Sequence, residues 1–440
     1  MPPSFSPGHP YAFSRSHRYG AAIDEMIGYQ APAFAEACLD VHKDDDMFGF
    51  SVGVCGRFSL AAMAYFRAGL SIYDSIDQVA RWGFDGLEHV DRFLDFACGY
   101  GRSNRFLAPA LSPSRLWVSD IQRDAVEFQQ ARFGVHGFES ARAPEDLRCE
   151  EHFDMIFVAS LFSHLPPHSF TRWLRRLHDL LAPGGLLVFS VHDEAVNRHG
   201  VEMPEEGIVF LPTTEVPALD TADYGATYVT ESFVRRALAD ATGSSDAVRL
   251  PRALCFEQDL YVVGKGDGSA RGDLSGSYRR GANGALDLVE IYPDELRLTG
   301  WAADVDRVGI DHIEILLGGE VVGHGVPRTS RPDVAVHLGD PAETSFLASG
   351  WSITCAVPHL RARMDDLLLV GATSAAGSRF TLDVAPLREL GVRGRDLPPP
   401  RTGVAAAPRK LATAGRMVRD AGIAATWRHA TRRLPRPRRS

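Results

Sequence analysis

The chain has 440 residues, 45% of them hydrophobic, so two domains are expected, while no run of eighteen apolar residues is present to span a membrane. Its formal net charge of −9 argues against nucleic acid as a partner, because proteins bind phosphates chiefly through Lys and Arg. The first sixteen residues lack the apolar stretch of a secretory signal, and the six cysteines form no CxxC pair, which favours a reducing, cytoplasmic location without structural zinc.

Residues 1–59 form an N-terminal segment in the predicted domain organisation. Its middle part, Tyr19 to Phe50, contains aromatic residues and the acidic run Asp44-Asp45-Asp46. We interpret this segment as a candidate lid over a pocket formed by later residues. Its composition names no substrate.

A βαβ unit is predicted in the first third of the chain. The apolar run Phe93–Phe96 leads into the small-residue turn Ala97–Arg102, Ser103–Ala110 has apolar residues at helical spacing, and Leu116–Ser119 is a second apolar run. Glycines in the turn allow positive φ and a close approach of the backbone to a ligand. Asp120 ends the second strand, where a carboxylate can accept hydrogen bonds from both hydroxyls of a ribose. The unit therefore predicts a site for a nucleoside-containing cofactor.

Two details of the turn argue against a nicotinamide dinucleotide. A dinucleotide fingerprint needs a third glycine for close packing of the helix, but the pattern here is Gly99-x-Gly101-x-x-Asn104. The acid Asp95, four residues before the first glycine, would repel a pyrophosphate and suits the ammonium group of a methionine moiety. The turn therefore favours a sulfur-containing nucleoside cofactor over NAD.

Further patterns typical of alternating strands and helices follow downstream of Asp120. Residues His152–Ser160 read as a strand that opens with F-D-x-I, Leu181–Ser190 as an L-A-P-G-G turn into a strand, Tyr228–Val234 as a capped helix start and Gln258–Gly264 as a closing strand. Together with the sequence L-D-F-A-C-G-Y-G-R at Leu94–Arg102, these segments resemble the ordered motifs of class I S-adenosylmethionine-dependent methyltransferases.

The resemblance covers residues 60–265 and implies the fold of that family. This is an α/β fold with a Rossmann-like, doubly wound, mostly parallel sheet of seven strands, and the implied cofactor is S-adenosylmethionine. In the L-x-P-G-G turn, Pro183 is expected to stop the preceding helix, and Gly184 and Gly185 are expected to supply left-handed conformations before the fifth strand.

The resemblance also implies which residues contact the cofactor. Asp120 is expected on the ribose hydroxyls, although capping of the following helix is an alternative role, and Ile121 is expected against the adenine. Arg102 is expected to brace the loop through Asp95 or through the carboxylate of the cofactor. Ala97 stands where the family usually has glycine, and a methyl group there costs little if φ is negative but slightly tightens the loop. The complete predicted set is Asp95, Ala97, Gly99, Gly101, Arg102, Asp120, Ile121 and Ser160.

Transfer of a methyl group from a sulfonium demands little of the protein beyond alignment of the nucleophile and exclusion of water. A general base is needed only if the acceptor must lose a proton, and His192 and His164, near two strand ends, are the candidates. Either histidine could instead hold its loop in place. His164 and His168 have a zinc-like spacing, but Pro166 and Pro167 forbid the helix that would align them, so no metal site is expected.

A smaller all-β domain is predicted at residues 276–388, after a Gly-rich linker at 266–275. Seven short apolar runs indicate a β-sandwich, and Gly318-Gly319 between two of them indicates a hairpin. The runs are Leu286–Ile291, Leu296–Ala302, His312–Leu317, Glu320–Gly323, Trp351–Val357, Leu367–Ala372 and Arg379–Val384.

Three short motifs of this domain are similar to sandwich modules appended to bacterial glycosyltransferases and cell-envelope enzymes. They are L-T-G-W-A-x-D from Leu298, R-P-D-V-A from Arg331 and G-W at Gly350. The resemblance implies a role in presenting substrate or contacting a partner. Trp301 and Trp351 are interpreted as core residues, with sugar stacking as the alternative, and Arg331-Pro332-Asp333 as a corner whose charges pair.

The tail, residues 389–440, is Pro- and Arg-rich. From Arg393 onward it has 13 Lys and Arg against two acids, a net of +11, so that residues 1–392 carry −20. Its middle section could form a basic amphipathic helix that makes a peripheral contact with anionic lipid or an acidic partner, but a solvated tail is favoured.

The sequence thus predicts an enzyme that transfers a methyl group from S-adenosylmethionine to a small-molecule or glycan acceptor, with a hydroxyl as the favoured acceptor group. The alternative is a non-catalytic scaffold of the same fold in an envelope or glycan assembly complex. The oligomeric state is left open.

Overall fold

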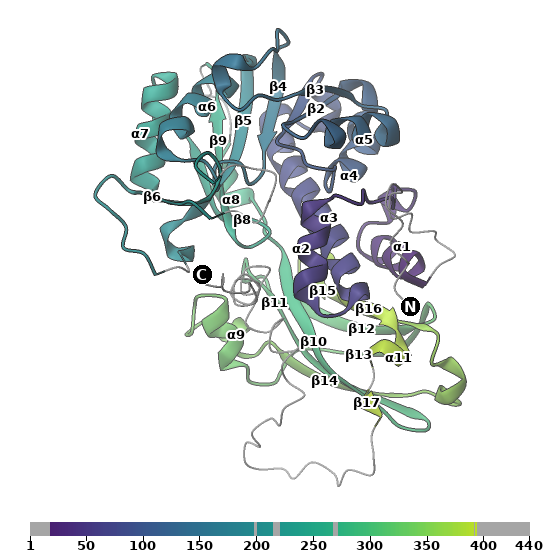
Figure 1. The fold of residues 1–440 in the computed structure, drawn as a ribbon. Coiled ribbons are helices and arrows are strands. Elements are labelled where there is room, and N and C mark those ends of the chain that lie inside the picture. The colour runs from purple at the N-terminus through teal and green to yellow at the C-terminus, as the bar shows by residue number, and fades with distance from the viewer. Residues whose placement is uncertain (1–17, 198–199, 214–220, 267–271, 391, 394–440) are drawn as a thin grey trace, which may run out of the picture. The chain divides into compact units, whose positions relative to one another are not determined.

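The computed structural model describes residues 18–197, 200–213, 221–266, 272–390 and 392–393 (Figure 1). Contacts divide the chain into two compact units. We call Val41–Asp46 with Arg67–Arg280 the α/β unit, and Met1–Asp40, Met47–Phe66 and Gly281–Ser440 the β unit.

The α/β unit contains the predicted mostly parallel sheet of seven strands. Their order is β3-β2-β1-β4-β5-β9-β8, with parallel pairs as far as β5 and with β9 antiparallel to both of its neighbours. The hairpin β6–β7 extends the sheet to nine strands, because β7 pairs with the end of β5. The strands are β1 (Phe93–Phe96), β2 (Leu116–Asp120), β3 (His136–Glu139), β4 (Phe153–Val158), β5 (Leu181–Asp193), β6 (Ile208–Leu211), β7 (Ala226–Val229), β8 (Val248–Leu254) and β9 (Gln258–Gly264).

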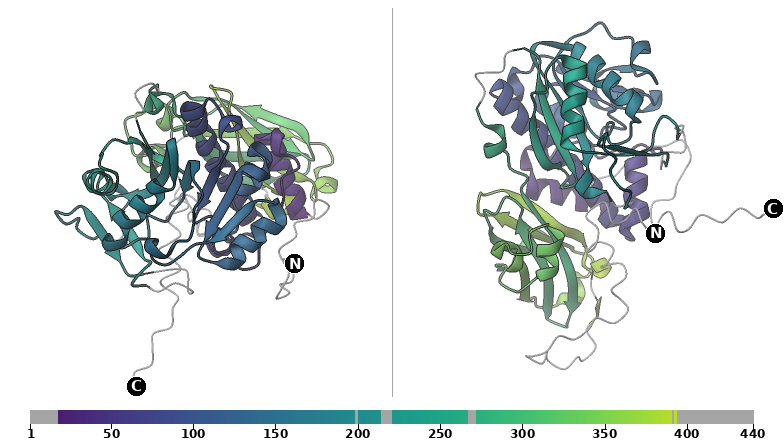
Figure 2. Two further views of the ribbon diagram at one scale, coloured as in Figure 1. Left: turned by 90° about the horizontal axis from the view of Figure 1, so that it is seen from above. Right: turned by 90° about the vertical axis from the view of Figure 1, so that its left-hand side faces the viewer.

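Helices lie on both sides of this sheet, as in a doubly wound fold (Figures 1 and 2). On one face, Trp173 of α6 and Leu238 of α7 pack in one core cluster with Ile156 of β4 and Phe189 of β5. Because both faces are covered, the central strands read as nearly continuous apolar runs. The helices of this unit are α4 (Asn104–Leu111), α5 (Arg123–Phe133), α6 (Pro167–Asp179), α7 (Glu231–Thr242), α8 (Leu274–Ser277) and the part of α3 (Phe58–Phe84) that follows Phe66.

The glycine pair of the L-x-P-G-G sequence lies inside β5, and one of its two predicted conformations needs a correction. Gly184 is left-handed, with φ +79°, as predicted. Gly185 has no positive φ; a Cβ there would lie 3.0 Å from the carbonyl oxygens of Ala182, Asp154 and Phe153. The second glycine is therefore required by close packing against backbone and not by its conformation.

The β unit contains a sandwich of two four-stranded sheets, β14-β11-β10-β17 and β13-β12-β15-β16, and each of the seven predicted runs is a strand. Gly318 and Gly319 form the predicted hairpin turn, with φ of +57° and +78°. The strands are β10 (Ala282–Ile291), β11 (Glu295–Asp304), β12 (Ile310–Leu317), β13 (Glu320–Gly325), β14 (Gly350–Ala356), β15 (Leu367–Ser374), β16 (Arg379–Pro386) and β17 (Val392–Arg393). Three short helices accompany them: α9 (Pro332–His337), α10 (Thr344–Leu347) and α11 (Leu387–Leu390).

Both candidate sugar-stacking tryptophans belong to the core of the β unit. Trp301 is 4% exposed and Trp351 is 2% exposed. Neither indole can therefore offer a face to a sugar, and the core interpretation is confirmed. Arg331 donates hydrogen bonds to Asp333 at 2.8 and 2.9 Å and to Asp287 at 2.7 Å, which is the predicted charge-paired corner.

The N-terminal helices α1 (Arg18–Gln30) and α2 (Asp46–Cys55) belong largely to the β unit. Tyr29 donates a hydrogen bond to Glu314 at 3.0 Å, and its ring occupies the space that a side chain at Gly371 would need. Arg57, before α3, donates to both carboxylate oxygens of Asp383 at 2.7 Å. These contacts place the N-terminal helices and Arg57 against the sheet that contains β12, β15 and β16.

This division differs from the predicted one at two boundaries. The described part of the predicted N-terminal segment, residues 18–59, does not stand apart, because most of it belongs to the β unit. The α/β unit extends past the predicted linker to Arg280, since Tyr278 donates to Ser75 at 2.8 Å and Trp82 donates to the Gly272 carbonyl at 2.5 Å. The basic tail lies outside the described residues, apart from Glu389, Leu390, Val392 and Arg393. Among the described residues, no helix has the length and apolar character of a membrane span.

Candidate active site

The loop between β1 and α4 contains two glycines with different roles. Gly99, with φ +52°, has no atom within 4 Å of the position that a Cβ would take, so the backbone is open to a ligand there. Gly101, with φ +77°, is closed: a Cβ would lie 2.6 Å from Phe133 and 2.7 Å from Gln129. The loop is therefore packed on α5 at Gly101 and exposes its backbone at Gly99.

Ala97 does not have the negative φ at which its methyl group would cost little. Its φ is +58°. The chain needs a left-handed residue directly after β1, which explains why this position is suited to glycine. An L-residue in this conformation is strained by about 1–2 kcal/mol.

Replacing Ala97 with glycine is expected to raise the free energy of unfolding by about 0.5–1 kcal/mol, because relief of the strain exceeds the added chain entropy of the unfolded state. Urea unfolding measures this change. Ala239, an exposed residue inside α7, is the matched control, since its replacement with glycine should lower stability by about as much. Equal losses in both variants would contradict the strain at Ala97.

Asp95 is buried at the end of β1 and is held by a residue that the sequence did not identify as functional. Asn104 donates a hydrogen bond to Asp95 at 2.8 Å and a second one to Gln129 at 2.8 Å. Burial raises the pKa of Asp95 to about 7, a net effect in which the hydrogen bond from Asn104 lowers the pKa and the nearby charge of Asp120 raises it. A cation beside Asp95 would favour its ionised form, which is the role expected of the methionine ammonium.

Gln129 of α5 also orders the loop and was missed. It donates to the Gly99 carbonyl at 2.8 Å and to the Cys98 sulfur at 3.0 Å. Burial raises the pKa of the Cys98 thiol, so that this cysteine stays protonated. A glutamine on the buried face of α5, beside Val126 and Phe133, was the signal in the sequence.

Asp120 is at the end of β2, and its carboxylate orders the backbone around it. The Gly99 amide donates to one oxygen at 2.8 Å, and the Gln122 amide donates to the other at 2.9 Å. The backbone amide of Ile121 also stabilises this carboxylate, so at least one of its roughly four acceptor positions remains for a ribose hydroxyl. Asp120 thus fits the ribose role while also ordering the start of α5, and Ile121, the predicted adenine contact, is half-buried beside it.

Arg102 lies close enough to Asp95 for its charge to lower the pKa of that carboxyl group, which opposes the larger effect of burial. Its carbonyl oxygen lies against Gly69 of α3, where a Cβ would come within 2.2 Å. Arg102 therefore fixes the end of the loop on α3 through its backbone.

Ser160, after β4, belongs to a second polar network at the strand ends. Its φ is +60°, and its amide donates to Ser190 at 2.7 Å. The Ser190 hydroxyl donates to Gln258 at 2.6 Å, and the Gln258 amide donates back to the Ser160 hydroxyl at 2.9 Å. Ser190 and Gln258 were not predicted, because they come from β5 and β9, which are far from Ser160 in the sequence.

The two predicted histidines lie near each other, with ring centroids 6.3 Å apart. His164 Nδ1 is 2.6 Å from the Gly225 carbonyl oxygen, which can only accept, so Nδ1 carries the proton. Burial lowers the pKa of His164 to about 4, and its ring stacks on Tyr224 at 4.5 Å. These contacts tie the loop after β4 to the segment before β7, which is the structural role left open by the sequence. His192, at the end of β5, stacks on Tyr228 at 5.5 Å.

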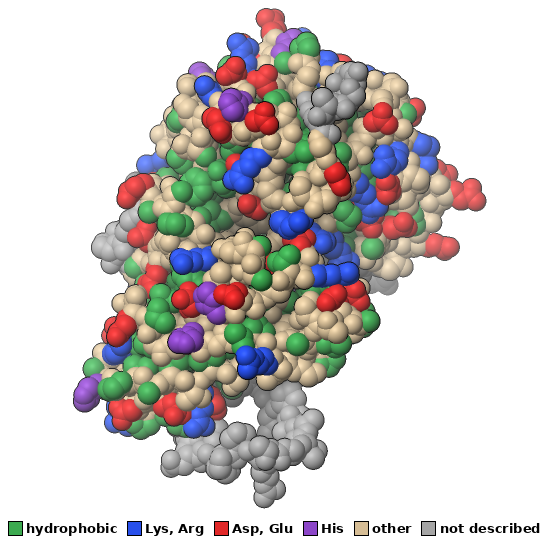
Figure 3. Space-filling model, turned by 180° about the vertical axis from the view of Figure 1, so that it is seen from behind, with side chains coloured by type: hydrophobic (Ala, Val, Ile, Leu, Met, Phe, Trp, Pro, Cys, Tyr) green, Lys and Arg blue, Asp and Glu red, His purple; other side chains and the backbone are tan. Residues whose placement is uncertain are grey.

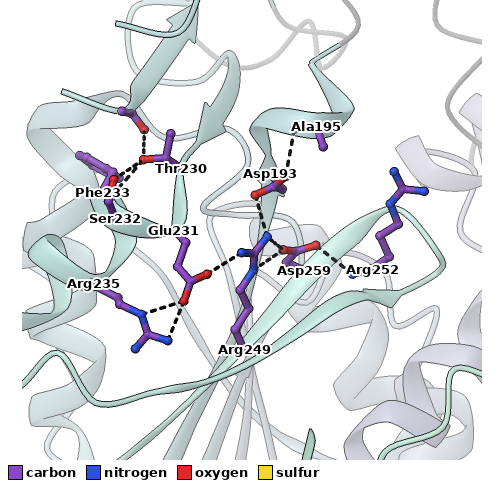
Figure 4. A network of polar contacts seen from close by, with 11 residues as sticks. Asp193, Ala195, Thr230, Glu231, Ser232, Phe233, Arg235, Arg249, Arg252 and Asp259 are labelled. Atoms are coloured by element: carbon purple, nitrogen blue, oxygen red, sulfur yellow. Dashed lines mark hydrogen bonds and ion pairs between the residues drawn. The ribbon is translucent and has the colours of Figure 1, made fainter. Parts of the chain in front are cut away.

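Arg249 of β8 fixes the strand end that carries His192 (Figure 4). It donates to Asp193 of β5 at 2.8 Å, to Asp259 of β9 at 2.8 Å and to Glu231 of α7 at 2.6 Å. One guanidinium therefore binds three carboxylates from three elements. Within the described part of the chain, no group of three or more His, Cys, Asp or Glu is placed to hold a metal ion.

The loop between β1 and α4 lies within a segment that matches a known protein family. Residues 94–187 match a family described as a methyltransferase domain. The chain contains a class I S-adenosylmethionine-dependent methyltransferase domain. Its cofactor is S-adenosylmethionine, and the residues present fit it, since the open backbone at Gly99 and the spare acceptor position of Asp120 match a close-lying nucleoside. None of the curated proteins matches the chain at a significant level.

Solved methyltransferases align with the methyltransferase domain at low identity. An S-adenosylmethionine-dependent methyltransferase from Clostridium acetobutylicum is 14% identical, with 45% of this chain and 92% of that chain covered and a TM-score of 0.32. The 1,6-didemethyltoxoflavin-N1-methyltransferase of Burkholderia thailandensis is 19% identical, with coverage of 46% and 80% and a TM-score of 0.33. The magnesium protoporphyrin IX methyltransferase of Synechocystis is 15% identical, with coverage of 46% and 87% and a TM-score of 0.33. No substrate follows from likeness at this level.

Proposed function

We propose that the methyltransferase domain transfers a methyl group to a hydroxyl group of a small molecule. The observation that carries this proposal is the charge state of the strand ends beside Ser160. The carboxylates of Asp193, Asp259 and Glu231 are all bound by Arg249, and His164 is held neutral by burial. A cationic amine needs a carboxylate beside it, whereas a neutral hydroxyl can be held by hydroxyl, amide and imidazole groups.

His192 is the residue that we assign to proton removal, with His164 as the alternative. S-adenosylmethionine supplies an activated methyl group, and a hydroxyl acceptor must release its proton during attack. His192 is at the end of β5, which is fixed by the bond from Arg249 to the adjacent Asp193. His164 is a weaker base, since its pKa is lowered to about 4 and its Nδ1 proton is held by Gly225.

The β unit supports a small molecule over a glycan as the acceptor. Its two candidate sugar-stacking side chains, Trp301 and Trp351, are core residues. On the face shown in Figure 3, acidic and basic side chains are mixed, a pattern that does not favour nucleic acid as a partner. All six cysteines are described and none forms a disulfide, which supports a reducing compartment such as the cytoplasm.

Methyl transfer from labelled S-adenosylmethionine to matched phenols and benzylamines tests the proposal, because benzylamines are cationic near pH 7. Label is expected in the phenols and not in the benzylamines, and the rate should rise with pH as the general base loses its proton. Label in the benzylamines would contradict the hydroxyl assignment. If the purified protein binds the cofactor but labels no acceptor of either class, the scaffold alternative is favoured.

A further inference from the structure

A short segment of the N-terminal region lies on the cofactor loop. Residues Val41–Asp46, which we call the strap, belong to the α/β unit, although the residues on both sides of them belong to the β unit. The ring of His42 stacks on Tyr100 with centroids 4.5 Å apart and planes at 7°, and it meets Phe128 edge-on at 5.3 Å. Burial lowers the pKa of His42, so the ring that stacks is neutral near pH 7.

The other end of the strap contacts the residue that follows Ile121. Gln122 donates a hydrogen bond from its side chain to Asp46 at 3.2 Å, and it accepts one from the Tyr100 hydroxyl at 3.3 Å. Tyr100 and Gln122 are therefore linked to each other and to opposite ends of the strap. Both residues lie next to backbone bonds to Asp120, which accepts hydrogen bonds from the amides of Gln122 itself and of Gly99, the residue before Tyr100.

We propose that the strap is a clamp that holds the cofactor loop in its binding conformation, with His42 and Asp46 as positioning residues for S-adenosylmethionine. This inference rests on the proposed role of Asp120 in binding the ribose. The physical reason is preorganisation. A loop with left-handed residues at Ala97, Gly99 and Gly101 costs free energy to order. If the strap orders the loop before the cofactor binds, this cost is not subtracted from the free energy of binding.

A purely structural role for the strap is the competing explanation. His42, Tyr100 and Phe128 could pack together only to bury apolar surface. Loss of the stack would then lower the stability of the protein without changing the affinity of the folded protein for its cofactor. Affinity and stability must therefore be measured separately.

The test is calorimetric titration of the full-length protein and its variants with S-adenosylhomocysteine, below the thermal transition of each variant. His42→Leu removes the stacked ring and is expected to weaken binding about fivefold, whereas His42→Phe keeps a stacked ring and should stay within about twofold of the natural protein. Asp46→Ala should weaken binding, and Asp46→Asn, which keeps an acceptor oxygen, should restore most of it. Lys43→Ala is the matched control, because the side chain of Lys43 pairs with its neighbour Asp44.

Two outcomes would overturn the proposal. In one, His42→Leu and Asp46→Ala bind as tightly as Lys43→Ala. In the other, His42→Phe loses as much affinity as His42→Leu. If the Leu variant does not fold, the Asp46 pair decides alone. Failure of the ribose assignment is distinguishable, because Asp120→Ala would then bind normally while the natural protein still bound S-adenosylhomocysteine.

Discussion

Replacing Asp120 with alanine is expected to weaken the binding of S-adenosylmethionine at least tenfold, which corresponds to about 1.4 kcal/mol. The carboxylate is buried, and its two oxygens already order the amides of Gly99 and Gln122. Alanine would remove the acceptor for the ribose and would also release both amides. Charge-assisted hydrogen bonds of this kind contribute about 1.5–3 kcal/mol each, so the tenfold loss of cofactor affinity is a lower bound.

Two variants control this measurement by calorimetric titration. Asp120→Asn keeps the volume and one acceptor oxygen, so its affinity should lie between those of the natural protein and Asp120→Ala. Glu127→Ala removes a carboxylate of α5 that pairs with Arg123, and it should leave the affinity unchanged. An unchanged affinity in Asp120→Ala would show that Asp120 serves only to order the start of α5.

Replacing Gly101 with alanine is expected to lower the free energy of unfolding by about 3 kcal/mol. The φ of +77° is strained for any L-residue, and the new methyl group would lie 2.6 Å from Phe133 and 2.7 Å from Gln129. Gln129 cannot move aside freely, because it is bonded to Asn104 and to the Gly99 carbonyl. Urea unfolding followed by circular dichroism measures the effect.

Gly99→Ala is the matched control for Gly101→Ala, since its φ of +52° is strained in the same way but its Cβ position is open. It should lower stability by only about 1 kcal/mol. Its methyl group would instead occupy the space where the cofactor approaches the backbone, so this variant should lose more affinity than stability. Equal losses of stability in the two variants would contradict the packing of Gly101 on α5.

The sequence predicted most of the methyltransferase sheet because local signals were strong. The strands β1, β2, β4 and β5 are buried on both faces, so they stand out as apolar runs between turns that contain glycine or proline. The strands of the β unit alternate between core and surface and were found for a similar reason. The left-handed φ of Ala97 was not predicted, because it follows from the path between β1 and α4 and not from the preference of alanine.

The residues that support the site were not predicted, because their partners are distant in the sequence. Gln258 reaches Ser160 across 98 positions, and Arg249 reaches Asp193 across 56. The packing of α1 on β16 and the bond from Arg57 to Asp383 likewise join the two ends of the chain. Patterns of periodicity show which face of an element is buried, but they do not show which distant residue covers it.

The central claim is that the loop from Asp95 to Asp120 binds S-adenosylmethionine. Calorimetric titration of the purified protein with S-adenosylmethionine, S-adenosylhomocysteine and NAD tests it most directly. We expect micromolar binding of both sulfur-containing cofactors and no binding of NAD, because Asp95 disfavours a pyrophosphate. Binding of NAD alone, or of none of the three by a folded protein, would contradict the account.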